Sequence, residues 1–288
     1  MKTSIIILNW NGKRHLRGCL ASIARHTKSP HQIIVVDQGS KDGSVQFIEE
    51  NYPAVKIIRN RQNVGIAKAT NQAFRIAKNE YVYLLGNDTI VTDGWLESCI
   101  KIMESDRRIG CVASTLVPPG MLGRIVPEKR RFSKDNACSQ GMLIRRKVLD
   151  RIGYYDENNF NPYGGEETDW NYLLRRAGYR ILETKESIVG HIGGGDTKRQ
   201  NPDRELLLNV GRLKAMLFND SFFSFLKRLP GLALVFFNGL KSGTAKVILK
   251  SYYTNFQNRA TIYRERQKRD ELIGRLRQEQ RLAGIDWF

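Results

Sequence analysis

Residues 4–12, SIIILNWNG, and residues 33–44, IIVVDQGSKDGS, decide the fold of this chain. Each begins with a run of β-branched and other apolar residues, which is typical of a strand buried on both faces of a sheet. Each then passes into a polar, glycine-containing loop. Between the two runs, apolar residues recur at helical spacing, at Leu16, Cys19, Leu20 and Ile23. The pattern therefore predicts strand, helix, strand, which is the unit of a parallel sheet.

The same alternation continues along the chain and predicts further elements. The expected helices are 44–51, 66–78 and 95–104, and the expected strands are 55–59, 81–85 and 110–116. Parallel strands joined by right-handed crossover helices give an α/β architecture. We therefore expect an α/β fold with a mostly parallel sheet flanked by helices.

The composition fits a folded protein and excludes several classes. The chain has 288 residues, 41% of them hydrophobic, and a formal net charge of +18, which describes neither a disordered chain nor a multi-span membrane protein. The four cysteines form no CxxC pair, so we expect a reducing compartment rather than a zinc ribbon or a disulfide framework. We expect neither a signal peptide nor a spanning segment of about 20 apolar residues. The charge leaves three partners open: nucleic acid, an anionic membrane, or a phosphorylated substrate.

Polar residues follow three of the expected strands. Asn9 and Asn11 follow the first strand, Asp37 follows the second, and Asn87 and Asp88 follow the strand at 81–85. Ligands bind beyond the carboxyl ends of parallel strands, so three such loops favour a shared site. A carboxylate there can hold a pyrimidine base or a ribose hydroxyl, and Asp88 can hold Mg²⁺ or Mn²⁺ against a diphosphate. A single loop of this kind is usually an ordinary turn, because Asp, Asn and Gly are good turn formers.

A second group of polar residues lies at 164–170, GGEETDW. Glu166, Glu167 and Asp169 stand at the start of an expected helix, where the helix dipole favours negative charge. Adjacent carboxylates also raise each other's proton affinity, which suits one of them for proton abstraction. His191 precedes three glycines, which allow the backbone to approach a bound group closely. Structural and functional roles both stay open for these residues.

Seven segments of the chain follow one another in a recognisable order. They are SIIILNWNG (4–12), IIVVDQGSKDGS (33–44), RNRQNVGIAKATNQA (59–73), YLLGNDT (83–89), CSQGMLIRRKVLDRIGYYDE (138–157), GGEETDWNYLLRRAGYRI (164–181) and VGHIGGG (189–195). In this order they resemble a family 2 inverting glycosyltransferase of the GT-A fold, and within that family the bacterial rhamnosyltransferase-like enzymes. The resemblance covers about residues 1–215.

The resemblance implies a fold and a division of the chain. The fold is the GT-A, or nucleotide-diphospho-sugar transferase, form of a Rossmann-like sheet, with a C-terminal helical extension. Residues 1–209 would form the catalytic domain, with a nucleotide-binding half to about 117 and an acceptor half over 118–209. Residues 210–288 would form a basic helical extension.

The resemblance also implies a role for each matching residue. The donor, a dTDP-sugar or UDP-sugar, is expected at Asn9, Asn11, Asp37, Gly65, Asn71 and Asn87. A divalent cation, Mg²⁺ or Mn²⁺, is expected at Asp88 and His191, and the sugar and acceptor at Gln140, Gly141 and Trp170. The catalytic base is expected at Glu167, with Glu166 and Asp169 beside it.

The implied reaction is a single displacement with inversion, in cell-surface polysaccharide or glycolipid synthesis. Glu167 would take a proton from the acceptor hydroxyl, and the metal at Asp88 would neutralise charge on the leaving diphosphate. Two positions depart from the family pattern. Gly86 stands where the DxD-type motif usually has Asp or Asn, so either Asn87 substitutes or Asp88 binds the metal with fewer protein ligands. Glu167 stands where many relatives have Asp, which leaves the choice between the adjacent acids open.

Two basic regions are expected to flank this site. Residues 118–147 carry eight Lys or Arg against two acids, and residues 210–288 interleave basic and aromatic residues. The second region fits helices lying on an anionic bilayer, and equally a helical subdomain that packs on the sheet. The membrane interpretation suits a lipid-linked acceptor and a cytoplasmic protein bound peripherally to the inner face of the plasma membrane. The sequence leaves homo-oligomer formation open.

Other function classes fit less well. A nucleic-acid-binding protein is opposed by the acids at the strand ends and by the lack of a recognition motif. The chain has neither GxGxxG nor GxxxxGK[ST], so no dinucleotide fold or P-loop is expected. A nucleotidyltransferase usually has a first loop rich in glycine and lysine, unlike residues 9–12. A non-catalytic sugar-nucleotide-binding protein is favoured mainly by Gly86.

Overall fold

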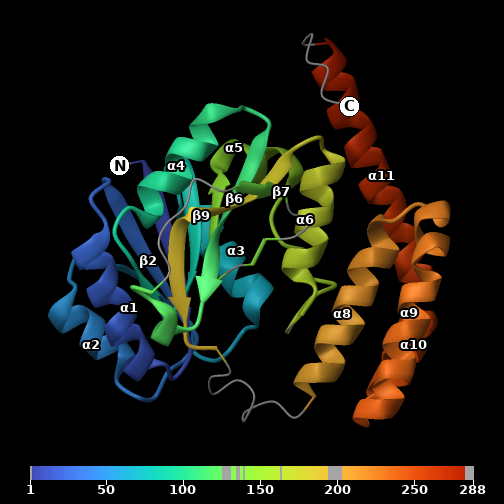
Figure 1. The fold of residues 1–288 in the computed structure, drawn as a ribbon, viewed down its shortest axis with the longest axis horizontal. Helices are drawn as coiled ribbons and strands as arrows, with labels where there is room; N and C mark the ends of the chain where they lie inside the picture. The colour runs from blue at the N-terminus through green and yellow to red at the C-terminus, as the bar shows by residue number, and fades with distance from the viewer. Residues whose placement is uncertain are drawn as a thin grey trace.

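The computed structural model describes residues 2–124, 131–133, 137–138, 140–162, 164–193 and 203–282, with the backbone alone for 131–133 and for Phe222. The described strands are β1 (Thr3–Asn9), β2 (His31–Asp37), β3 (Lys56–Arg59), β4 (Tyr81–Gly86), β5 (Thr89–Val91), β6 (Ile109–Val117), β7 (Arg131–Ser133), β8 (Gly141–Arg145) and β9 (Arg180–His191). They form one sheet in the order β3-β2-β1-β4-β8-β6-β9-β5, with β7 paired to β9 (Figure 1).

Helices cover both faces of this sheet (Figure 1). The described helices are α1 (Lys13–His26), α2 (Ser44–Asn51), α3 (Ile66–Ile76), α4 (Trp95–Ser105), α5 (Arg146–Ile152), α6 (Glu166–Arg176), α8 (Arg204–Asn219), α9 (Phe222–Ser242), α10 (Ala245–Gln257) and α11 (Arg259–Leu282), with a short 3₁₀ helix, η1 (Pro119–Met121). Helices α1, α2 and α4 contribute to one buried cluster, and α3, α5 and α6 contribute to the other.

The central strands contribute side chains to both buried clusters, because alternate side chains of a strand point to opposite faces of the sheet. Ile5 and Ile7 of β1 pack with α1, α2 and α4, whereas Ile6 packs with α3, α5 and α6. A strand covered on both sides is apolar at every position, which is why residues 5–8 form a continuous apolar run. The predicted α/β fold with a mostly parallel, helix-flanked sheet is confirmed.

The two halves of the sheet differ in how well the sequence predicts them. β1 pairs in parallel with β2 and β4, and β2 pairs in parallel with β3, as expected. In the other half, β8 runs antiparallel between β4 and β6, while β5 and β7 run antiparallel to β9. The sequence pattern does not predict β5, β7 or β8. β5 and β7 have three residues each, too few to show a period.

Helices α8 and α11 pack on the sheet domain. A Cβ on Gly211 of α8 would stand 2.0 Å from the carbonyl oxygen of Gly164, so the two backbones touch where α6 begins. Ile273 and Leu276 of α11 are buried in the cluster that contains α3 and α6. The expected domain boundary at residue 209 therefore falls inside α8. No helix in the described part of the chain is long and apolar enough to cross a membrane.

A buried ion pair joins α11 to α6. Arg269, 6% exposed, donates to the two carboxylate oxygens of Asp169 over 3.1 and 2.8 Å. The same guanidinium donates to Asp156 over 2.9 Å, and Asn219 at the end of α8 donates to Asp169 over 2.7 Å. Because a buried carboxylate needs charged or polar partners, this one group ties α6, α8 and α11 together.

Removal of the arginine should therefore destabilise the whole domain. We expect Arg269→Ala to lower the free energy of unfolding by about 3 to 5 kcal/mol, because Asp169 is left buried without its counter-charge. Lys268→Ala is the matched control: its side chain is 70% exposed, and the expected change is within about 0.5 kcal/mol. Urea unfolding measures both. Equal midpoints for the two variants would show that the pair is dispensable.

Candidate active site

The carboxyl ends of β1, β2 and β4 place three predicted loops side by side. β1 lies between β2 and β4, with Asn9 opposite Asp37 and Leu8 opposite Gly86. The Asn9 amide donates to a carboxylate oxygen of Asp37 over 3.0 Å, and the Asn87 amide donates to Asn9 over 3.0 Å. The loops thus form one hydrogen-bonded edge, as the strand order predicts.

Asp37 is oriented by its own loop. Its Oδ1 accepts the backbone N–H groups of Gly39 over 3.1 Å and of Ser40 over 2.9 Å, while Oδ2 faces Asn9. The side chain is 2% exposed. A carboxylate has about four lone-pair directions, and the bonds among the described residues use three of them.

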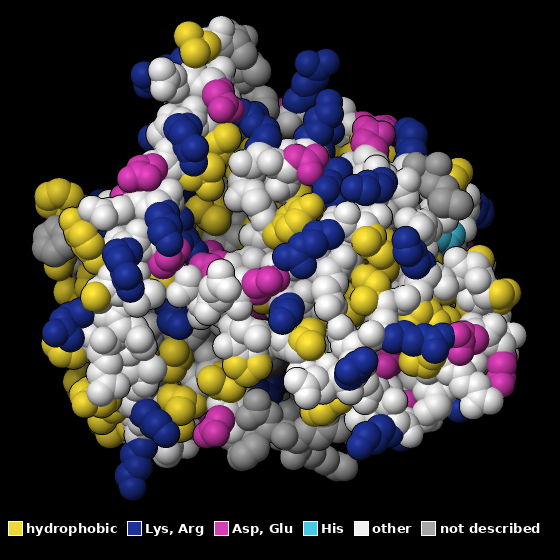
Figure 2. Space-filling model, turned by 180° about the vertical axis from the view of Figure 1, so that it is seen from behind, with side chains coloured by type: hydrophobic (Ala, Val, Ile, Leu, Met, Phe, Trp, Pro, Cys, Tyr) yellow, Lys and Arg dark blue, Asp and Glu magenta, His cyan; other side chains and the backbone are white. Residues whose placement is uncertain are grey.

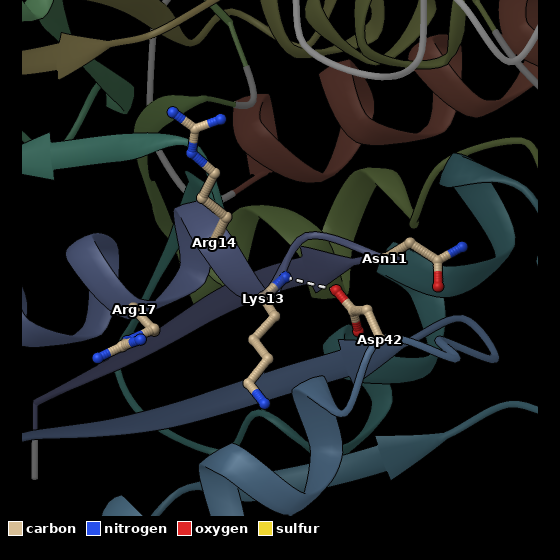
Figure 3. Close-up of a pocket in the computed structure, with 5 residues that line it drawn as sticks. All are labelled: Asn11, Lys13, Arg14, Arg17 and Asp42. Carbon is tan, nitrogen blue, oxygen red and sulfur yellow. Dashed lines mark hydrogen bonds between the residues drawn. The ribbon is translucent and has the colours of Figure 1, made fainter.

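Asn11 lies beside a basic hollow. Its backbone has φ of 49°, a left-handed conformation that Asn tolerates, and its side-chain oxygen accepts the N–H of Lys41 over 2.8 Å. Figure 3 shows the hollow, of about 530 Å³, lined by Asn11, Lys13, Arg14, Arg17 and Asp42. The backbone N–H of Lys13 donates to Asp42 over 2.7 Å. Three cations beside the strand edge make the local potential favourable for an anion.

Gly65 and Asn71 face another part of the chain. A Cβ on Gly65 would overlap the side-chain oxygen of Asn161, at 1.8 Å, and its φ of +89° also requires glycine. The Asn71 amide donates to the carbonyl of Tyr155 over 2.8 Å and to Glu157 over 2.7 Å, and its oxygen accepts the N–H of Tyr155. In the structure both residues therefore hold the segment at 155–162 against α3.

Asp88 and His191 meet across the sheet edge. Pairing of β5 with β9 sets Thr89 opposite His191, which leaves an oxygen of Asp88 3.3 Å from His191 Nε2. The hydrogen bond that His191 donates to the Asp88 carboxylate raises the pKa of His191 above its ordinary value. Burial is the largest single influence on Asp88 and opposes its ionisation, but the hydrogen bond and charge of His191 together with backbone hydrogen bonds outweigh it, so the pKa of Asp88 lies below the ordinary value. The two predicted metal ligands thus lie together and are half-buried.

The side chains around this pair pack closely over Gly86. A Cβ there would stand 2.9 Å from an Asp88 oxygen and 3.2 Å from Cγ of Gln140. The space that an Asp or Asn side chain would need at this motif position is thus occupied by the side chains of Asp88 and Gln140. Among the described residues no group of three or more His, Cys, Asp or Glu is arranged around a metal. Asp88 and His191 would therefore supply two ligands, which fits a cation completed by substrate phosphate oxygens and water.

Gln140 and Gly141 line the same edge. The Gln140 carbonyl accepts the Gly86 N–H over 3.4 Å, and its side chain contacts the Cys138 thiol. Burial raises the pKa of Cys138 to about 12, and the negative charges of Glu167 and Asp88 act in the same direction. Cys138 therefore lies within electrostatic reach of both the predicted base and the predicted metal ligand.

Glu166 and Glu167 open helix α6 after two glycines with positive φ, Gly164 and Gly165. Glu166 is 6% exposed, and its Oε2 has no hydrogen-bond partner among the residues that the structure describes. Burial raises the pKa of Glu166 to about 7, and the charge of Glu167 adds to the rise. Glu167 is less buried. A carboxylate with a pKa near neutrality is suited to proton transfer.

Two predicted site residues have structural roles instead. Trp170 is 0% exposed, and its indole N–H donates to the carbonyl of Gly153 over 3.0 Å, so it is a core residue that cannot contact an acceptor. Asp169 is 1% exposed and is held by Arg269 and Asn219, so its carboxylate is not available as a base. Arg269 and Asn219 were not predicted, because neither carries a local sequence signal.

The basic surface expected at 118–147 is only partly described. Lys129, Arg130 and Lys134 lie outside the described residues, as do Gly194 and Gly195 after His191. Arg145 donates to the carbonyl of Met103 over 2.5 Å, and Arg146 donates to the carbonyl of Phe74 over 2.6 Å. These two arginines therefore bind carbonyls near the ends of α4 and α3, where a cation is favoured, and do not belong to a free basic surface.

Comparison with known sequences places the chain among sugar transferases. The model of the family described as "Glycosyl transferase family 2" matches residues 4–162. The chain is 28% identical over 195 residues to the uncharacterized glycosyltransferase YwdF of Bacillus subtilis (strain 168), covering 63% of this chain and 70% of that protein. It is 30% identical over 181 residues to a chondroitin synthase of Pasteurella multocida (strain Pm70), covering 60% of this chain but only 18% of the synthase.

Superposition on solved structures identifies the class of the fold. GalNAc-T7, crystallised with UDP, GalNAc and Mn²⁺, superposes with a TM-score of 0.60 at 16% identity, covering 75% of this chain and 47% of that chain. The mannosyltransferase PcManGT from Pyrobaculum calidifontis, in complex with GDP-Man and Mn²⁺, superposes with a TM-score of 0.58 at 16% identity. The superposition covers 88% of this chain and 87% of that chain. The fold is therefore of the GT-A type, as the sequence resemblance implies.

The buried carboxyl of Glu166 should make stability depend on pH. Its pKa is about 7 in the folded protein against an ordinary value of 4.5, so the folded state binds this proton more tightly than the unfolded state. The stabilisation is full below the ordinary pKa and is lost as the pH rises through 7. We expect the stability of the protein relative to Glu166→Gln to fall by about 3 kcal/mol across that window.

Urea unfolding at acidic and at mildly alkaline pH measures this difference. Glu80→Gln, at an exposed position, is the control and should follow the unmodified protein at both pH values. A stability difference between the protein and Glu166→Gln that is the same at both pH values would contradict the prediction.

Proposed function

The chain belongs to glycosyl transferase family 2, and we propose that it transfers a sugar from a nucleoside-diphosphate donor to a saccharide or lipid-linked acceptor. The observation that carries the proposal is the single sheet edge at which Asn9, Asp37 and Asn87 meet the Asp88–His191 pair. The sugar would be rhamnose or another hexose. Synthesis of a cell-surface polysaccharide or glycolipid is the setting that suits such an acceptor.

The donor base and ribose would lie against Asp37 and its neighbours. The Asp37 carboxylate would accept the imide N–H of uracil or thymine, which suits a UDP-sugar or a dTDP-sugar. Asn11 borders the basic hollow, whereas Gly65 and Asn71 would act indirectly, because they hold the segment at 155–162 against α3. The two solved relatives carry UDP and GDP-Man in their complexes, which supports a nucleotide-sugar donor here.

A divalent cation, Mg²⁺ or Mn²⁺, would be held by Asp88 and His191. Both superposed enzymes were crystallised with Mn²⁺, and a carboxylate with an imidazole is an acceptable partial ligand set for that ion. When bound, such a cation supplies positive charge to the diphosphate leaving group. Gln140, packed over Gly86, would border the sugar and the acceptor beside this pair.

Glu167 would act as the base in a single displacement. It would accept the proton of the acceptor hydroxyl, while the oxygen bonds to the anomeric carbon and the nucleoside diphosphate departs from the opposite side, which inverts the configuration. Its charge acts on Cys138 together with that of Asp88, which supports this assignment. Glu166, whose carboxyl is held near neutral pKa, is the alternative base.

Substitution of the base should affect turnover and spare donor binding. We expect Glu167→Gln to lower turnover by about 10²-fold or more, because the amide cannot accept the proton. Release of nucleoside diphosphate from UDP-sugars and dTDP-sugars, with water as acceptor, measures turnover, and titration calorimetry measures donor binding. Glu80→Gln is the control and should keep normal values. Normal turnover in Glu167→Gln together with loss in Glu166→Gln would move the base to Glu166.

Metal removal should weaken the binding of nucleoside diphosphates. After treatment with EDTA we expect the affinity for UDP or dTDP to fall by about tenfold or more, since the diphosphate loses its counter-charge, and added Mn²⁺ or Mg²⁺ should restore it. Asp88→Asn should show the weak affinity whether or not metal is present. Affinity that EDTA leaves unchanged would contradict a metal at this pair.

A further inference from the structure

Helices α9 and α10 leave a large apolar surface exposed. Phe223 is 74% exposed, Leu234 is 60% exposed and Phe237 is 58% exposed. Further large apolar side chains are exposed on the same two helices: Leu226, Leu229, Val235, Leu240, Leu249, Tyr253 and Phe256. Exposed apolar side chains gathered on two adjacent helices often mark a site of interaction with a protein or a membrane. We call the surface formed by these ten residues the apolar face.

The exposure follows from the way the helices stack. α10 packs on α8, where Asn255 donates to the carbonyl of Val210 over 3.1 Å. α9 packs on α10, where Gly239 lies against Ile248 and Tyr252 donates to the carbonyl of Leu232 over 3.0 Å. α9 is thus the outer helix of the two, and α10 is the element on which it chiefly packs. The ten side chains of the apolar face are therefore largely exposed in the described chain.

The charges around the apolar face have one sign. Residues 221–258 contain five basic residues and no acidic residue. Arg228 pairs with Asp220, which precedes α9, over 2.7 Å. The other four basic residues are exposed: Lys227, Lys241, Lys246 and Lys250. Figure 2 shows hydrophobic side chains with Lys and Arg among them along its left edge, where the C-terminal helices lie. The surface is complementary to a partner that is apolar and anionic.

We propose that α9 and α10 dock the protein onto an anionic lipid bilayer, lying in the plane of the membrane. The apolar face enters the boundary between headgroups and acyl chains, and the lysine ammonium groups reach the lipid phosphates. Aromatic side chains such as Phe223 and Tyr253 are favoured in this interfacial zone. A second copy of the chain is a poorer partner, because a two-fold contact would set lysine against lysine with no acid to pair them.

Docking in this way would hold the sheet edge close to the membrane. α8 carries α10 on one side and touches Gly164 and Gly165 on the other, directly before Glu166. One helix therefore separates the docked pair from the predicted base. This step rests on the proposed function: an acceptor carried by a lipid of the same bilayer would be presented to Glu167 without leaving the membrane.

Co-sedimentation of the full chain with vesicles tests the docking. We expect binding to phosphatidylcholine vesicles that contain phosphatidylglycerol, and weak binding to phosphatidylcholine alone. Phe223→Ser, Leu234→Ser and Phe237→Ser combined should abolish binding and leave the unfolding temperature nearly unchanged, since the three side chains are exposed. Leu282→Ser, at a position 82% exposed at the end of α11, is the apolar control and should bind normally.

A charge variant tests the lysines separately. Replacement of Lys227, Lys241, Lys246 and Lys250 by Gln should weaken binding to anionic vesicles by about tenfold or more. The matched control replaces four exposed lysines elsewhere, Lys56, Lys68, Lys101 and Lys147, by Gln. The two variants have equal net charge, so only the location of the lysines differs. The control should bind as the unmodified protein does.

Three outcomes would overturn the proposal. The serine variant could bind vesicles normally, the two lysine variants could bind equally, or the chain could be a dimer that the serine variant converts to a monomer. The last would assign the apolar face to a second copy. Vesicle binding needs no donor or acceptor, so it is measured independently of nucleoside diphosphate release, and failure of one proposal leaves the other standing.

Discussion

A carboxylate buried at the start of α6 must be paired, and its pairing with Arg269 determines how the C-terminal part of the chain is arranged. The pair brings α11 onto the sheet domain, and Asn219 brings the end of α8 to the same point. Two consequences follow. The first turn of α6, with Glu166 and Glu167, is fixed relative to the strand ends, and α9 with α10 is left projecting from α8. The site and the apolar face thus depend on one buried contact.

The first half of the fold could be predicted because its signals are local. A strand covered on both faces is apolar throughout, and a helix on one face shows its own period, so β1, α1, β2, α2, β3, α3 and β4 follow from the residues. Parallel order then brings the strand ends together. Asn9, Asp37 and Asn87 are joined by hydrogen bonds as expected, and β5 adds the contact of Asp88 with His191.

The remainder could not be predicted because a buried polar group does not reveal its partner in the sequence. Asp169 and Arg269 are 100 residues apart, and an arginine in a charged helix has no pattern that marks it as buried. Arg145 and Arg146 count as positive charge in the sequence, yet they bind backbone carbonyls of other elements. Trp170 stands among predicted site residues but faces the core. In each case tertiary contact, not local sequence, decides the role.

The most direct test of the account is a donor panel read by the unfolding temperature of the full chain with Mn²⁺ or Mg²⁺ present. UDP-sugars, dTDP-sugars and GDP-sugars are compared with an oligonucleotide at low salt. The account predicts that a pyrimidine nucleotide sugar stabilises the fold, by about 2.7 kcal/mol when present at 100 times its Kd. Stabilisation by the oligonucleotide alone, lost steeply as salt is added, would contradict a sugar-nucleotide site.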